Sequence, residues 1–99
     1  MTRARKLSPQ TLSVLNALAS RPGDWLYGLE LSKLTGLKSG SLYPILIRLS
    51  DRGLLRSRWL EPTEQGRPPR HAYQVSAAGL KALAETERTR NAVLRELRT

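Results

Sequence analysis

The sequence predicts a mainly α-helical fold that carries one small β-hairpin, an α+β class, and three observations lead to this prediction. Apolar residues recur at three- and four-residue spacing in several segments of the chain, as on the buried face of a helix. Between residues 54 and 75 the spacing changes to the alternation that strands show. A loop rich in proline and glycine interrupts this alternating region, which is typical of a hairpin.

Length and composition bound the possible functions. The 99 residues suffice for one domain. Lys and Arg number 17 and Asp and Glu number 8, so the formal net charge of +9 makes polyanions the expected partners. The absence of Cys excludes disulfides, thiolate metal sites and a Cys nucleophile. We find no apolar run of membrane-spanning length and no signal-peptide pattern, and therefore expect a cytoplasmic location.

The chain is expected to have three parts: a flexible basic arm at residues 1–7, a folded domain at residues 8–76 and a helix at residues 77–99. Short basic arms can lie on phosphate, but most are only solvated, and we favour solvation here. The first helix of the domain begins with Ser8 as N-cap and Pro9 at the first helical position. Its apolar coverage is wider than one stripe, which suggests packing on two sides.

A second, shorter helix is expected at residues 27–35, with Leu31 and Leu34 pointing inward and Gly36 ending it. The link to the next helix is very short, Leu37-Lys38-Ser39. Two short helices joined by a tight, glycine-containing turn are typical of a helix-turn-helix. An ordinary helical hairpin is the alternative.

The third helix, residues 39–52, has one apolar face and a polar, uncluttered N-terminal tip. The helix is expected to start near Ser39 to Ser41, because Pro44 is tolerated in a first turn and costly later. Gly53 supplies the stop. Such a helix can enter a major groove, although a core helix of a small bundle could look the same. Its inward residues are Leu42, Ile45, Leu46 and Leu49.

Two strands follow. In residues 54–60 the side chains of Leu55, Ser57 and Trp59 fall on one side, and two arginines fall on the other. Residues 61–70 form the loop, and residues 71–75 resume the alternation. A hairpin directly after a helix-turn-helix makes a winged helix. Trp25-Leu26 could add a minimal strand, and we read both tryptophans as core residues.

The tip of the third helix is the candidate DNA contact. The hydroxyls of Ser39, Ser41 and Tyr43 can reach phosphates or base edges, and the absent side chain of Gly40 permits close approach. Lys38 stands just before the tip as a phosphate contact. Each has a duller alternative: the serines could be caps, the tyrosine partial core and the lysine a solvated charge.

The predicted wing adds Arg67 and Arg70 on a loop that Pro68 and Pro69 stiffen. Such a loop can place arginine against the DNA backbone or in the minor groove. Glu61 and Glu64 leave the loop nearly neutral, so this contact rests mainly on Arg67. Arg48 on the third helix, together with Arg52, Arg56 and Arg58, enlarges the basic surface.

The last helix is expected to begin after Ser76 as its cap and to dimerise. Leu80 and Leu83 could fold back on the domain, but Leu94 and Leu97 lie too far along to reach so small a core. We assign Leu83, Leu94 and Leu97 to dimerisation. Glu87 and Arg90 in the middle of this seam weaken the pairing or set its register.

Enzymatic chemistry has little support. The only histidine, His71, stands in the hairpin and is read as a surface strand residue. The loop carboxylates have no base, metal ligand or oxyanion site near them. We therefore expect no catalytic residue, no metal site and no cofactor.

Two blocks resemble the PadR family of transcriptional regulators. One is Gly40-Ser41-Leu42-Tyr43-Pro44 with the leucines and Gly53-Leu54 behind it, and the other is Gly66-Arg67-Pro68-Pro69-Arg70-His71-Ala72-Tyr73 with Ser76 and Gly79. They occur in the family's order, and the resemblance runs from Leu12 to the end. It implies a homodimer that represses transcription from a palindromic operator and, in many members, is released by a small-molecule effector such as a phenolic acid or a hydrophobic drug.

The short members of that family, which this chain resembles in length, carry a single C-terminal helix for dimerisation. In some of them a tryptophan on that helix lines an aromatic drug pocket between the subunits. Residues 77–99 contain no aromatic residue here, and this departure puts such a flat pocket in doubt.

Two hypotheses remain. The first is a DNA-binding transcriptional regulator acting on double-stranded DNA as a homodimer. The alternative is a winged-helix protein-interaction module or adaptor, at which Ile47 hints because it points away from the apolar face. A general nucleic-acid coating protein fits poorly, because stacking aromatics are scarce.

Overall fold

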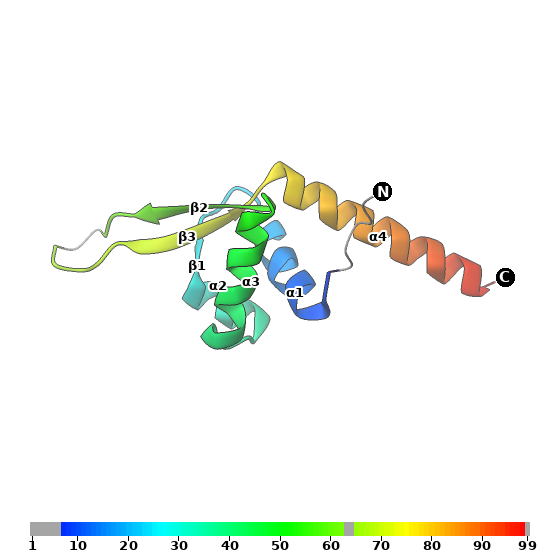
Figure 1. Cartoon of the computed structure of the whole chain (residues 1–99), viewed down its shortest axis with the longest axis horizontal. Coiled ribbons are helices and arrows are strands. Elements are labelled where there is room, and N and C mark those ends of the chain that lie inside the picture. Colours follow the sequence, from blue (N-terminus) through cyan, green and yellow to red (C-terminus); the bar gives the residue numbers. More distant parts are fainter. Residues whose placement is uncertain (1–6, 63–64, 99) are drawn as a thin grey trace.

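A computed structural model describes residues 7–62 and 65–98. It contains four helices and a three-stranded antiparallel sheet with the strand order β1-β3-β2, the α+β class that was predicted. The β2–β3 hairpin projects from one end of the molecule and α4 from the other, over a longest extent of 61 Å (Figure 1). The elements are α1 (Pro9–Ala19), β1 (Leu26–Tyr27), α2 (Gly28–Thr35), α3 (Ser39–Asp51), β2 (Leu55–Leu60), β3 (Arg70–Val75) and α4 (Ala77–Arg98).

The helix ends follow the local sequence signals. The Ser8 hydroxyl accepts a hydrogen bond from the Thr11 amide, and Pro9 opens α1. Gly36 closes α2 with φ 77°. Gly53 follows α3 with φ 75°, where the Gly53 amide donates to the Ser50 carbonyl and the Leu54 amide to the Leu49 carbonyl. This pair of bonds is the Schellman motif, which only a residue tolerant of positive φ completes cheaply.

One core lies between the helices and one face of the sheet. Every residue of the predicted inner face of α3 is at most 3% exposed. Tyr73 and Val75 of β3 and Leu55 of β2 join it from the sheet, as their shared side of the hairpin requires. The core residues of the helices and of β1 are Val14, Leu15, Leu18, Leu26, Leu31, Leu42, Ile45, Leu46, Leu49 and Leu83.

The helix α4 is seated on the base of the hairpin and then leaves the body. The Ser76 hydroxyl accepts from the Gly79 amide and donates to the Gly53 carbonyl, which joins α4 to the end of α3. Leu83 is buried in the core of its own chain. This is the first of the two alternatives considered for it, packing on its own domain or dimerisation. All of residues 87–98 are exposed, Leu94 and Leu97 among them, so this half of α4 projects away from the body (Figure 1).

Three sequence-based expectations about burial or position are wrong. Leu34 is 47% exposed, because α2 ends one residue later and its last turn extends past the core. Neither tryptophan is a core residue: Trp25 is half-buried and outside the core cluster, and Trp59 is 65% exposed, because the hairpin runs beyond the layer of helices that covers Leu55. Pro44 does not lie in the first turn: α3 starts at Ser39, as expected, and Pro44 is its sixth residue.

Candidate nucleic-acid interface

The turn between α2 and α3 fixes how α3 is presented. The Ser32 hydroxyl donates to the Leu37 carbonyl at 2.6 Å, and the Leu37 amide donates to the Thr35 hydroxyl at 3.2 Å. The turn consists of Gly36, Leu37 and Lys38. Gly36 has a left-handed conformation, and these bonds tie Leu37 to α2. Because the opposite face of α3 is anchored in the core, its N-terminal tip is held on two sides by rigid structure.

The tip itself is bare. Lys38 is the N-cap of α3, without a side-chain capping bond, and the three residues that follow are exposed. The alternative in which Ser39 or Ser41 caps the helix is therefore wrong. A Cβ atom added to Gly40 would have no heavy atom within 4 Å, and the first turn has no acidic residue. No acidic side chain of the first turn thus offsets the positive end of the helix dipole, which favours an anion such as phosphate.

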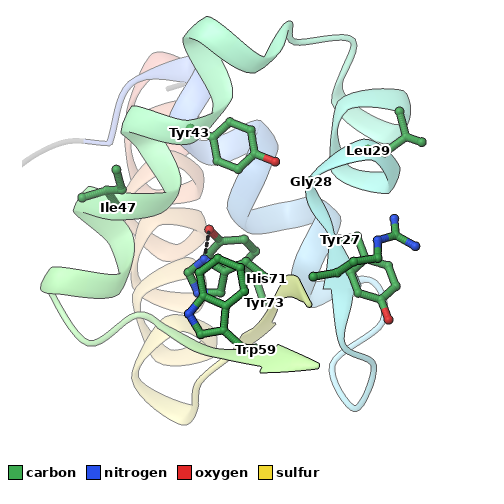
Figure 2. A pocket seen from close by; sticks show the side chains of 9 residues that line it. Tyr27, Gly28, Leu29, Tyr43, Ile47, Trp59, His71 and Tyr73 are labelled. Carbon is green, nitrogen blue, oxygen red and sulfur yellow. Dashed lines mark hydrogen bonds between the residues drawn. The ribbon is translucent and has the colours of Figure 1, made fainter. Parts of the chain in front are cut away.

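Tyr43 lies at the edge of this tip and is 42% exposed. Its phenol ring leans over Gly28, the first residue of α2, and a Cβ atom at that glycine would collide with the hydroxyl oxygen (Figure 2). The absent side chain of Gly28 is therefore what allows Tyr43 to take this position. The Glu30 carboxylate, which accepts from the Tyr27 amide at 3.1 Å, holds the start of α2 in place.

Pro44 alters the hydrogen bonding of the same face. Proline has no amide hydrogen, so the carbonyl of Gly40, four residues earlier, lacks its usual partner within α3. Gly40 and Pro44 stand one above the other on the exposed side of the helix.

An open cleft of about 510 Å³ separates α3 from the hairpin. Tyr43 and Ile47 line it from α3, and four aromatic residues line it from the strands: Tyr27, Trp59, His71 and Tyr73 (Figure 2). The Trp59 and His71 rings stack at 4.5 Å between centroids with 14° between their planes, and Tyr73 and His71 share a 3.0 Å hydrogen bond at Nδ1. Burial, and then the neighbouring Tyr43, raises the pKa of Tyr73, so its phenol keeps its proton at neutral pH.

The basic residues are distributed over both the hairpin and α3. Arg70 is exposed, and its guanidinium lies 3.7 Å from the centre of the Tyr27 ring. Arg67 is exposed in the hairpin loop, whereas Glu64 lies outside the described residues. Arg48 is exposed on α3.

The other two hairpin arginines are held elsewhere. Arg56 and Arg58 lie over the Trp25 ring, at 5.6 Å and 4.3 Å from its centroid. They occupy the opposite face of the hairpin from Trp59, because side chains alternate along a strand. Of the predicted basic surface, this pair therefore does not face the cleft.

The structure thus brings together only part of the predicted site. Lys38, Ser39, Gly40 and Ser41 form one exposed tip, and Tyr43 connects it to the cleft. Sequence reasoning missed Gly28, Trp59 and His71, which line the cleft together with Tyr43. For Trp59 the available signal was the strand alternation, which correctly put it on the side of Leu55 but could not tell where the covering helices end.

Within residues 7–62 and 65–98, no group of three or more His, Asp or Glu side chains could hold a metal ion. In the same part of the chain, no helix combines the length and the apolar character that crossing a bilayer requires.

The comparisons with known proteins include a family model and several solved structures that carry the same family name. The family model described as the transcriptional regulator PadR-like family matches residues 14–85. A PadR family transcriptional regulator from Eggerthella lenta is similar with a TM-score of 0.70 and 28% identity, over 85% of this chain and 76% of that one. A search among curated proteins finds no match.

Two further solved structures, both below 25% identity, share the fold. A PadR family transcription regulator from Clostridium difficile has a TM-score of 0.74 and 19% identity, over 92% of this chain and 96% of that one. A PadR-like transcriptional regulator from Bacillus cereus has a TM-score of 0.63 and 23% identity, over 90% and 86% of the two chains.

Proposed function

Because the chain belongs to the PadR-like family of transcriptional regulators, we propose that it represses transcription as a homodimer bound to a palindromic operator in the cytoplasm. Members of this family are DNA-binding regulators and not enzymes.

The bare tip of α3 is the observation that carries the proposal. Its residues Lys38, Ser39, Gly40 and Ser41 are exposed, while the other side of the helix is fixed in the core. In the major groove, this tip would put Lys38 and the hydroxyls against phosphate, and Tyr43 at the groove edge. Arg67 and Arg70 would meet the backbone from the wing, and Arg48 from α3.

The exposed half of α4 supports the dimer. Val93, Leu94 and Leu97 are each at least 48% exposed although they are aliphatic, and they lie at three- and four-residue spacing on one side of the helix. Pairing with a second copy would remove this apolar surface from water. A two-fold dimer would set its two α3 helices about 34 Å apart, one turn of DNA, and that symmetry is what a palindromic operator matches.

The experiment is a selection of the purified protein on random-sequence duplexes, followed by a footprint of the enriched sequence and of the DNA upstream of the protein's own gene. The proposal predicts one enriched motif with two-fold symmetry and a footprint that covers both halves. Enrichment of no motif, or a single unpaired half-site, would refute the proposal of a dimer on a palindrome. Repression requires in addition that the footprint overlap the promoter.

Release by an effector needs a binding site, and the cleft between α3 and the hairpin is the candidate. Its volume lies in the range of small-molecule sites, and the exposed Trp59–His71 stack offers an aromatic surface. A ligand there would touch Tyr43 and would compete directly with DNA. The expected signature is a compound that raises the melting temperature of the wild type but not of Trp59→Ala and that weakens DNA binding.

One observation favours a second candidate, the protein-interaction module. Leu29, Ile47 and Trp59 are each more than half exposed and line the same cleft. Such a patch can dock a protein segment. The two functions separate cleanly in the variant Lys38→Ala/Tyr43→Phe, which should lose affinity for the selected duplex but leave an adaptor function largely intact.

A further inference from the structure

The exposed side of α3 has an apolar centre. With 100° between successive residues, the line opposite the buried face passes through Gly40, Pro44 and Ile47, and Asp51 follows only in the last turn. None of the first three has a side-chain hydrogen-bonding group. Ile47 is the one that reaches outward, and it is 58% exposed.

The hydrogen-bonding side chains of α3 stand beside this line and are directed elsewhere. The Tyr43 hydroxyl is turned toward Gly28, at the start of α2. Arg48 and Ser41 lie on the other flank, away from the cleft that Tyr43 and Ile47 line. A duplex that meets α3 face on would therefore meet an aliphatic side chain at the centre of the contact.

The base edge that suits an aliphatic side chain in the major groove is the C5-methyl group of thymine. We infer that Ile47 is a specificity-determining residue and that it reads a thymine methyl group in each half of the operator. This inference rests on the proposed function. It also explains the exposure of Ile47 without a protein partner, which is the alternative that this exposure would otherwise support.

The test removes the methyl group alone. Each thymine of the selected duplex is replaced in turn by deoxyuridine, which keeps every hydrogen-bonding group of the base, and affinities are measured by titration. One thymine position in each half-site should respond to the replacement. Removing one methyl group there should weaken the affinity of the wild-type protein about fourfold, which corresponds to the free energy of burying one carbon. Ile47→Ala should bind the thymine duplex more weakly and show no loss at that position.

Leu34→Ala is the matched control, because Leu34 is a similarly exposed aliphatic residue that does not line the cleft. It should keep the full response to deoxyuridine. If no position responds in the wild type, the inference is wrong while the regulator proposal stands. If the response persists in Ile47→Ala, another side chain makes the contact and the assignment to Ile47 is wrong. If no duplex is enriched at all, the failure belongs to the proposed function.

Discussion

Gly28 and Gly79 are both buried, and each would collide with its surroundings if it carried a side chain, but the surroundings differ. At Gly79 the added Cβ atom would meet the carbonyl oxygen of Leu54, which is backbone and cannot rotate away. At Gly28 it would meet the phenol of Tyr43, the far end of a half-exposed side chain. One collision therefore acts on the fold, and the other acts on the surface that we propose to face DNA.

Gly79→Ala should lower the free energy of unfolding by about 2 kcal/mol or more, because α4 must shift off the base of the hairpin. Urea denaturation monitored by circular dichroism measures this change. A variant as stable as the wild type would show that α4 is not seated there.

Gly28→Ala should change stability by less than about 1 kcal/mol, since the gain in helix propensity offsets the displacement of Tyr43. Its affinity for the selected duplex should fall about tenfold, because the displaced ring no longer flanks the tip of α3. Unchanged affinity would mean that the position of Tyr43 over Gly28 has no part in DNA binding.

Exposure of single residues was the least predictable feature from sequence. Caps and stops are local, so Ser8, Gly53 and Ser76 could be assigned from a few neighbouring residues. The exposure of Trp59 depends instead on how far the helices extend over the hairpin. The spacing of apolar residues in the sequence does not reveal how far the helices extend over the hairpin.

At the scale of elements, α3 shows that a correct boundary can come with an incorrect position for Pro44. The sequence predicts a start near Ser39 to Ser41 on the premise that Pro44 lies in the first turn, whereas Pro44 is the sixth residue of α3. The cleft could not be predicted from the sequence either. Tyr43 comes from α3 and His71 from β3, and only the tertiary fold brings them together.

Pro44→Ala should raise the stability of the protein by about 1 to 2 kcal/mol, because it restores an interior helical hydrogen bond to the Gly40 carbonyl. Pro9→Ala is the control and should do the opposite by a few tenths of a kcal/mol, since proline at the first helical position is pre-organised. Thermal melts of both variants test this. Destabilisation by Pro44→Ala would mean that the proline ring packs productively.

Deletion of residues 90–99 should convert a dimer to a monomer with little loss of core stability, because residues 90–98 are all exposed within one chain. Light scattering measures the mass, and circular dichroism measures the folded fraction. A truncated protein that stays dimeric would contradict the role assigned to Leu94 and Leu97.

For the molecule as a whole, the net charge of +9 predicts strong binding to any polyanion, and only the geometry of α3 predicts selectivity. The sequence alone allowed the fold class and the regulator family to be inferred. The change from helical to strand spacing of apolar residues indicates the fold class, and the two motif blocks indicate the family. It could not place the wing arginines, because Arg70 is held against Tyr27 and Arg56 and Arg58 against Trp25.

The most direct test of the central claim, that the tip of α3 docks on a duplex, is the salt dependence of affinity for the selected duplex in three proteins. These are the wild type, Lys38→Ala at the tip, and Lys81→Ala, which removes an equal charge from exposed α4. Log affinity falls as log salt concentration rises, and we predict that the magnitude of this negative slope decreases by about 1 for Lys38→Ala. It should stay unchanged for Lys81→Ala. Equal slopes for the wild type and Lys38→Ala would contradict the account.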